Sequence, residues 1–137
     1  QFSMAGRLLY RTNGGGPGRG FNFLTIDARS GVLGSLRQFD TWGSTEAVDA
    51  MEDYLHSIPT GTLVLAAIAD DGSLLIDSGP RQLISDTLGS GLIDHLEYQW
   101  SWAIISRKGA LQPIAEGLRP NGTVVLRRLV SFPLPEL

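Results

Sequence analysis

The most regular hydrophobic pattern along the chain lies in residues 47–58. Apolar residues recur there at spacings of three and four and alternate with polar ones: Ala47, Val48, Met51, Tyr54, Leu55 and Ile58 against Asp49, Glu52, Asp53 and His56. This spacing predicts an amphipathic helix with one buried stripe and one solvent-exposed face. Ser44 or Thr45 can cap the start of this helix, and Glu46 suits the positive end of its dipole. Pro59 then ends it.

Several shorter stretches have the patterns of β-strands. Residues 21–27 are apolar on both faces, which is typical of a central strand between two layers. Residues 62–69 are apolar throughout and bounded by turns, which again indicates a buried strand. Further strands are predicted over residues 6–12, 32–39, 100–106 and 122–132, with a weaker strand within 112–118 and a short extension at 74–76.

A second helix is predicted over residues 81–88. Pro80 suits the first turn of this helix, and Gly89 suits the position just after its end. Residues 90–96 are expected to add a further helical turn. Strands predominate in this order of elements, and the two helices have room to lie outside a sheet or sandwich, so the expected fold class is α+β.

The composition fits one folded domain. The chain has 137 residues, of which 42% are hydrophobic and 18% are charged, and this is enough apolar material for one core. The net charge of −3 argues against a nucleic-acid partner or an acidic membrane held by bulk electrostatics. No apolar run is long enough to insert into a bilayer. Residues 1–4 resemble residues left from an expression vector, and residues 5–137 are expected to form a single domain.

Most catalytic and metal-binding chemistries are disfavoured by the residues present. The sequence contains no cysteine and only two histidines, His56 and His95, so neither a thiolate site nor a multi-histidine zinc site is predicted. The glycine-rich loop at residues 13–20 lacks the spacing of a nucleotide-binding motif. Neither a nucleophile elbow nor a particular carboxylate pair stands out. We therefore expect no catalytic residues, no metal and no cofactor, and a hydrolase remains a third hypothesis behind two kinds of binding module.

Three places in the loops are candidates for binding. Arg19 lies in the glycine-rich loop with little local reason to pack. Asp70 and Asp71 occupy a turn, where a solvated hairpin is the simpler interpretation, although a carboxylate pair can also hydrogen-bond sugar hydroxyls. Trp100 begins a predicted strand, where its ring can either fill the rim of the core or stack on the apolar face of a sugar. Trp102 lies on the same face and is expected in the core.

Four segments, in this order, resemble the interleukin-like EMT inducer (ILEI, or PANDER-like) domain family. They are residues 18–27 (GRGFNFLTID), 39–47 (FDTWGSTEA), 58–73 (IPTGTLVLAAIADDGS) and 102–109 (WAIISRKG). The match spans most of the chain, and the order and spacing of the four motifs are together more specific than any one of them.

The resemblance implies a compact β-β-α fold, with two mostly antiparallel sheets packed as a sandwich and two flanking helices. It also implies a non-catalytic module, because the family includes secreted cytokine-like proteins and the stem domain of protein O-mannose N-acetylglucosaminyltransferase. That stem domain binds a terminal β-linked N-acetylglucosamine. The implied location is extracytoplasmic, meaning secreted, lumenal or at the cell surface.

The sugar site of that stem domain matches this chain in part when it is carried over residue by residue. Its loop arginine matches Arg19, and its turn aspartate matches Asp70, with Asp71 adjacent. Its second arginine falls on Gln99, whose amide can still hydrogen-bond a sugar hydroxyl or acetamido group. The aspartate that follows falls on Trp100, whose ring can stack on the sugar. The cytokine-like members carry cysteines that this chain lacks.

The resemblance therefore implies a carbohydrate-binding module whose site comprises Arg19, Asp70, Asp71, Gln99 and Trp100. The expected ligand is a glycan, for example one with a terminal N-acetylhexosamine. The expected parent is a larger glycan-processing or cell-surface protein, and a neighbouring domain of that protein is a further expected partner. The alternative is a protein-interaction or cytokine-like signalling module.

Overall fold

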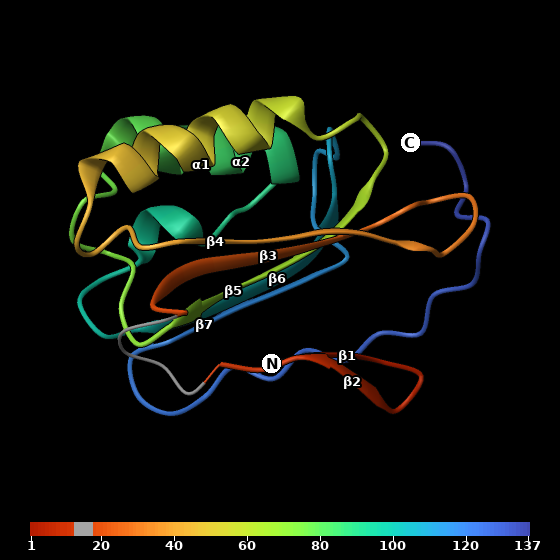
Figure 1. The fold of residues 1–137 in the computed structure, drawn as a ribbon, viewed down its shortest axis with the longest axis horizontal. Helices are drawn as coiled ribbons and strands as arrows, with labels where there is room; N and C mark the ends of the chain where they lie inside the picture. Colours follow the sequence, from red (N-terminus) through yellow and green to blue (C-terminus); the bar gives the residue numbers. More distant parts are fainter. Residues whose placement is uncertain (13–17) are drawn as a thin grey trace.

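The computed structural model describes residues 1–12 and 18–137 (Figure 1). In chain order the elements are β1 (Phe2–Met4), β2 (Arg7–Tyr10), β3 (Gly20–Ile26), β4 (Leu33–Phe39), α1 (Thr45–Ser57), β5 (Leu63–Ala69), α2 (Ser78–Leu88), the 3₁₀ helix η1 (Ile93–His95), β6 (Ser101–Arg107) and β7 (Ala115–Arg119). Most of the predicted glycine-rich loop lies outside the described residues.

Five strands form one antiparallel sheet in the order β4-β3-β5-β6-β7, and β1 and β2 form a separate hairpin. Strand β3 lies between β4 and β5, so that Phe21 pairs with Phe39 on one side and with Ile68 on the other. Every residue of β3 is buried, as its two apolar faces predict. Strands β4 and β7 are the edges of this sheet.

The five-stranded sheet lies between two layers. In Figure 1, α1 and α2 cover one face of the sheet, and the β1–β2 hairpin lies on the side of the other face. The core on the helix side includes Phe21, Phe23, Met51, Leu55, Ile84, Leu88 and Trp102. On the hairpin side, the Tyr10 hydroxyl donates to the Asn22 Oδ1 at 2.8 Å. The fold is therefore α+β, with two antiparallel sheets and two helices, as predicted.

Helix α1 is fixed at both ends, and its start agrees with the sequence pattern. The Ser44 Oγ accepts the backbone N–H of Ala47 at 3.1 Å. At the other end, the Lys108 ammonium donates to the carbonyl of Leu55 and, at 3.1 Å, to that of Ile58. Burial lowers the pKa of Lys108. The Lys108 cation complements the negative end of the helix dipole, so the end of α1 is tied to the β6–β7 turn.

Helix α2 begins at Ser78 rather than Arg81 because Asp77 caps it. The Asp77 Oδ1 accepts the backbone N–H of Gly79 at 3.1 Å, which adds a turn before the predicted start. The helix ends at Gly89, whose φ of +68° is the left-handed conformation that favours glycine. Within residues 1–12 and 18–137, no helix is long and apolar enough to cross a membrane.

The prediction of a strand over residues 122–132 is wrong. This part of the described chain pairs with no strand and instead packs through its side chains. Val124 and Leu126 are half-buried while Val125 is exposed, and a Cβ on Gly117 of β7 would lie 2.6 Å from the Val124 side chain. The alternating pattern therefore reflects burial of one side of the segment, which packing satisfies without a hydrogen-bonded ladder.

Two smaller predictions also change. The strand extension at 74–76 is wrong, because β5 ends at Ala69 and Asp70 adopts a φ of +59° that turns the chain out of the strand. The Leu75 N–H then bonds the Thr41 carbonyl at 3.1 Å. The predicted first strand is shorter, and as β2 it pairs with β1, which lies in residues interpreted as vector-derived.

Replacing Leu55 by Ala should lower the free energy of unfolding by about 2–5 kcal/mol. Leu55 lies on the buried face of α1 and is fully buried, so the truncation leaves a cavity between the helix and the sheet. Urea unfolding followed by circular dichroism measures the change. Leu129→Ala, at a side chain that is 98% exposed, is the matched control and should stay within about 0.5 kcal/mol. An equal loss in both variants would contradict this packing.

Candidate functional site

The antiparallel sheet brings four loops to one of its ends. The start of β3, the ends of β4 and β5, and the start of β6 lie together there, as the pairing registers require. We call this region the polar end; it comprises Arg19, Asp40, Asp70, Asp71, Gln99 and Trp100. The fold thus gathers all five predicted binding residues in one region, although Arg19 and Trp100 lie 81 positions apart along the chain.

Arg19 is held by an ion pair with Asp40. Its Nε and Nη2 donate to the two carboxylate oxygens of Asp40 at 2.9 and 2.7 Å, a bidentate geometry. The hydrogen bond from Arg19 is the main cause that lowers the pKa of Asp40. The same bond raises the pKa of Arg19, with a smaller contribution from the negative charge of Asp70. Arg19 is therefore positioned firmly, but two of its donors are engaged within the fold.

Asp40 was not among the predicted residues, although the sequence carries a signal for it. It begins the turn that leads into α1, and aspartate at the start of a turn commonly bonds the backbone two or three residues on. Its Oδ1 accepts the N–H of Gly43 at 3.1 Å as well as the bond from Arg19. A Cβ on Gly43 would lie 2.7 Å from the Arg19 guanidinium, so the turn leaves room for that side chain.

Asp71 joins two loops of the polar end. It is only 4% exposed, and its Oδ1 accepts the N–H of Ser73 at 2.7 Å while its Oδ2 accepts the N–H of Gln99 at 3.2 Å. Asp70 and Gln99 have φ angles of +59° and +60°, and both of their side chains are exposed. Asp71 thus fixes the loops, and Asp70 and Gln99 are the polar residues that face solvent.

The aromatic side chains at this end have different environments. Trp100 is half-buried and packs against the core, and Trp102 is 1% exposed, with its Nε1 donating to Glu116 at 2.8 Å. Trp42 and Tyr98, which the sequence reasoning missed, form a ring pair with centroids 5.5 Å apart. Tyr98 is 60% exposed. Only the folded chain brings these two loops into contact, so sequence spacing carried no signal for the pair.

Other combinations of reactive side chains are not brought together. Ser90, which lies near His95 in the sequence, instead donates to Glu116 and accepts the N–H of Ile93 at 3.1 Å. In the described part of the chain, no group of three or more histidine and carboxylate side chains is arranged to hold a metal ion.

Comparisons with known proteins agree with the motif resemblance. A family model described as "Interleukin-like EMT inducer" matches residues 19–110. Protein FAM3C of Xenopus laevis is 36% identical over 92 residues, which cover 67% of this chain and 39% of that protein. Human FAM3C is 34% identical over 92 residues, with the same coverage. The human cell migration-inducing and hyaluronan-binding protein is 31% identical over 91 residues, or 66% of this chain and 7% of that protein. The aligned region of this chain thus spans about two fifths of the length of the FAM3C proteins.

The Asp40 ion pair should make the stability of the fold pH-dependent in acid. The pKa of Asp40 is lowered in the folded chain, so its contribution is present above about pH 4 and is lost as the pH falls through the lowered value. Asp40→Asn should reduce stability at pH 7 and flatten the decline below pH 4, as measured by urea unfolding across a pH series. Asp94→Asn, at an exposed position in η1, is the control. An unchanged acid profile in Asp40→Asn would contradict this role.

Proposed function

Because the chain belongs to the interleukin-like EMT inducer family, we propose that it is a non-catalytic, extracytoplasmic module that acts by binding a protein partner. Interleukins act by binding receptor proteins, so the family's description favours a partner of that kind. The polar end lies inside the matched region of residues 19–110, which makes it the first surface to consider for such a partner.

The observation that carries this proposal is the aromatic pair at the polar end, in which Tyr98 is exposed and Trp42 is half-buried. Tyr98 and Trp42 contact each other, and Asp40 of the Arg19–Asp40 ion pair lies in the same turn as Trp42. Tyrosine, tryptophan and arginine are the residue types enriched at the centres of protein interfaces. The charged groups of Arg19 and Asp71 are meanwhile engaged within the fold. A surface with rigid aromatic anchors suits a protein partner.

We expect the fluorescently labelled chain to bind saturably to cells of the organism that encodes it. Replacing both Trp42 and Tyr98 by Ala should weaken this binding at least ten-fold, because the double change removes the exposed Tyr98 ring and the half-buried Trp42 ring that it contacts. Flow cytometry over a concentration series measures the affinity, and thermal unfolding checks that the variant is folded. Leu129→Ala, which removes an exposed apolar side chain far along the chain, is the matched control and should bind like the wild type.

Pre-treatment of the cells identifies the kind of partner. Mild protease digestion should abolish binding if the partner is a protein, whereas enzymatic removal of glycans should leave the binding intact. Absence of saturable binding, or binding that is lost only on removal of glycans, would overturn the proposal.

Glycan binding is a second candidate, favoured by the convergence of the predicted residues. Asp70 and Gln99 expose polar side chains at the same end of the sheet, next to Arg19 and the half-buried Trp100. Polar groups beside an aromatic ring suit a sugar, because the hydroxyls bond the polar groups and the apolar face of the sugar stacks on the ring. One relative is named a hyaluronan-binding protein, although the alignment covers only 7% of it.

Glycan binding predicts localised chemical shift changes when N-acetylglucosamine is titrated to millimolar concentration into the ¹⁵N-labelled chain. The changes should centre on the amides of Gly20, Asp70, Gln99 and Trp100. Asp70→Asn should weaken them by removing a carboxylate acceptor, whereas Asp94→Asn should not. If no change occurs at these four amides, this sugar does not bind at the polar end.

A further inference from the structure

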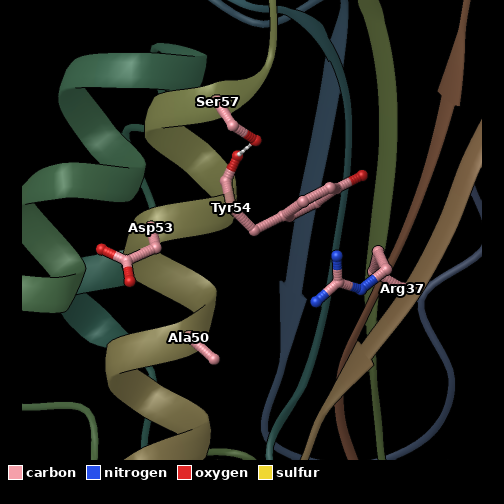
Figure 2. A pocket seen from close by; sticks show the side chains of 5 residues that line it. All are labelled: Arg37, Ala50, Asp53, Tyr54 and Ser57. Carbon is pink, nitrogen blue, oxygen red and sulfur yellow. Dashed lines mark hydrogen bonds between the residues drawn. The ribbon is translucent and has the colours of Figure 1, made fainter.

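A second candidate surface is the cleft between the edge strand β4 and helix α1. This open cleft has a volume of about 360 Å³ (Figure 2). Its lining residues are Arg37 from β4 and Ala50, Asp53, Tyr54 and Ser57 from α1. It is built from different residues than the polar end and takes no part in the function proposed above.

Arg37 is oriented in this cleft by two aromatic rings. Its guanidinium carbon lies 5.2 Å from the centroid of the Phe39 ring and 5.2 Å from that of Tyr54. A guanidinium that stacks face-on on an aromatic ring keeps its N–H groups available at its edges. Figure 2 shows Asp53, the carboxylate that lines the cleft, pointing away from Arg37. Within residues 1–12 and 18–137, no acceptor forms a hydrogen bond or ion pair with the Arg37 side chain.

The backbone beside this cation is also open on one side. Among the residues that the structure describes, strand β4 pairs with β3 alone, so the outward-facing backbone N–H and C=O groups of β4 have no partner strand there. A strand added at this edge would lie about 4.8 Å away, with its side chains alternating between the two faces. Arg37 faces the helices through its ring contacts, whereas its neighbour Leu36, 43% exposed, belongs to the opposite face. An added strand would therefore meet a cation on one face and an apolar side chain on the other.

We propose that the β4 edge binds an extended segment of a partner protein as an additional strand. An aspartate or glutamate of that segment pairs with Arg37 in the cleft, and the flanking apolar side chains pack against Leu36. The charge of the edge favours a segment with a carboxylate, because Arg37 is the one charged residue of β4. Asp53 on the cleft wall disfavours a polyanion and favours a single carboxylate between neutral residues.

Two blocked seven-residue peptides test this inference on the full chain. Val and Thr alternate in both, and one Thr position at the centre is Glu in the first peptide and Gln in the second. In titrations of the ¹⁵N-labelled chain, the Glu peptide should shift the amides of β4 and bind at least ten-fold more tightly than the Gln peptide. Arg37→Gln should remove this difference, and Arg37→Lys should keep part of it, because lysine pairs with a carboxylate without the bidentate geometry.

Matched controls separate this site from general charge effects and from the polar end. Arg29→Gln, an exposed arginine in the β3–β4 turn, should leave the preference for the Glu peptide unchanged. The Trp42→Ala and Tyr98→Ala double variant should also retain the preference for the Glu peptide. Loss of peptide binding at the β4 edge can then be distinguished from loss of partner binding at the polar end. Thermal unfolding checks Arg37→Gln, because this change removes the contacts with Phe39 and Tyr54.

The proposal is overturned if neither peptide binds, if the two bind equally, or if the shift changes lie away from β4 and α1. Stronger binding of polyglutamate or of an acidic polysaccharide than of the single-Glu peptide would also overturn it. If neither peptide binds, Arg37 would instead act as a charge that keeps other strands away from the edge.

Discussion

An aromatic cluster between the sheet and α1 joins the two layers, and the β4–α1 cleft depends on it. Phe23 of the central strand contacts Phe39 and Tyr54 with ring centroids 6.0 and 5.7 Å apart. Phe39 and Tyr54 in turn contact each other at 5.5 Å. Burial of such rings contributes strongly to stability and also fixes their orientation. Because the Arg37 guanidinium lies over two of these rings, the packing that anchors α1 also orients the cation of the cleft.

The loops at the polar end are held by two carboxylates that act within the fold. Asp40 ties the loop before β3 to the turn before α1, and Asp71 ties the loop after β5 to the loop before β6. These bonds keep the neighbouring exposed side chains in place, so binding at this end would cost little ordering of the backbone. The family match over residues 19–110 includes both the polar end and the β4–α1 cleft. Both surfaces therefore lie within the part of the chain that matches the family model.

Much of the fold could be predicted because local pattern and tertiary burial agree. Helix α1 has its cap, its stripe and its terminating proline within one short stretch, and the structure places its start at the predicted cap Ser44. Residues 122–132 show the limit of such reasoning, because their alternation is that of a strand and yet they pair with no strand of the described chain, while Val124 packs against Gly117. The pattern shows which side chains are buried, whereas a strand also needs backbone hydrogen bonds to a neighbouring strand, which the alternation of side chains does not specify.

The sequence by itself determined the helices, the central strands, the family and the set of loops that carry polar candidates. These features follow from short-range spacing, capping and motifs, which act over a few residues. Only the tertiary structure decided which candidates are engaged internally and which face solvent. Arg19 pairs with Asp40 and Asp71 is buried, while Tyr98 is exposed against Trp42. The reason is physical: these contacts join loops far apart in the chain, and the order and register of the strands bring them together.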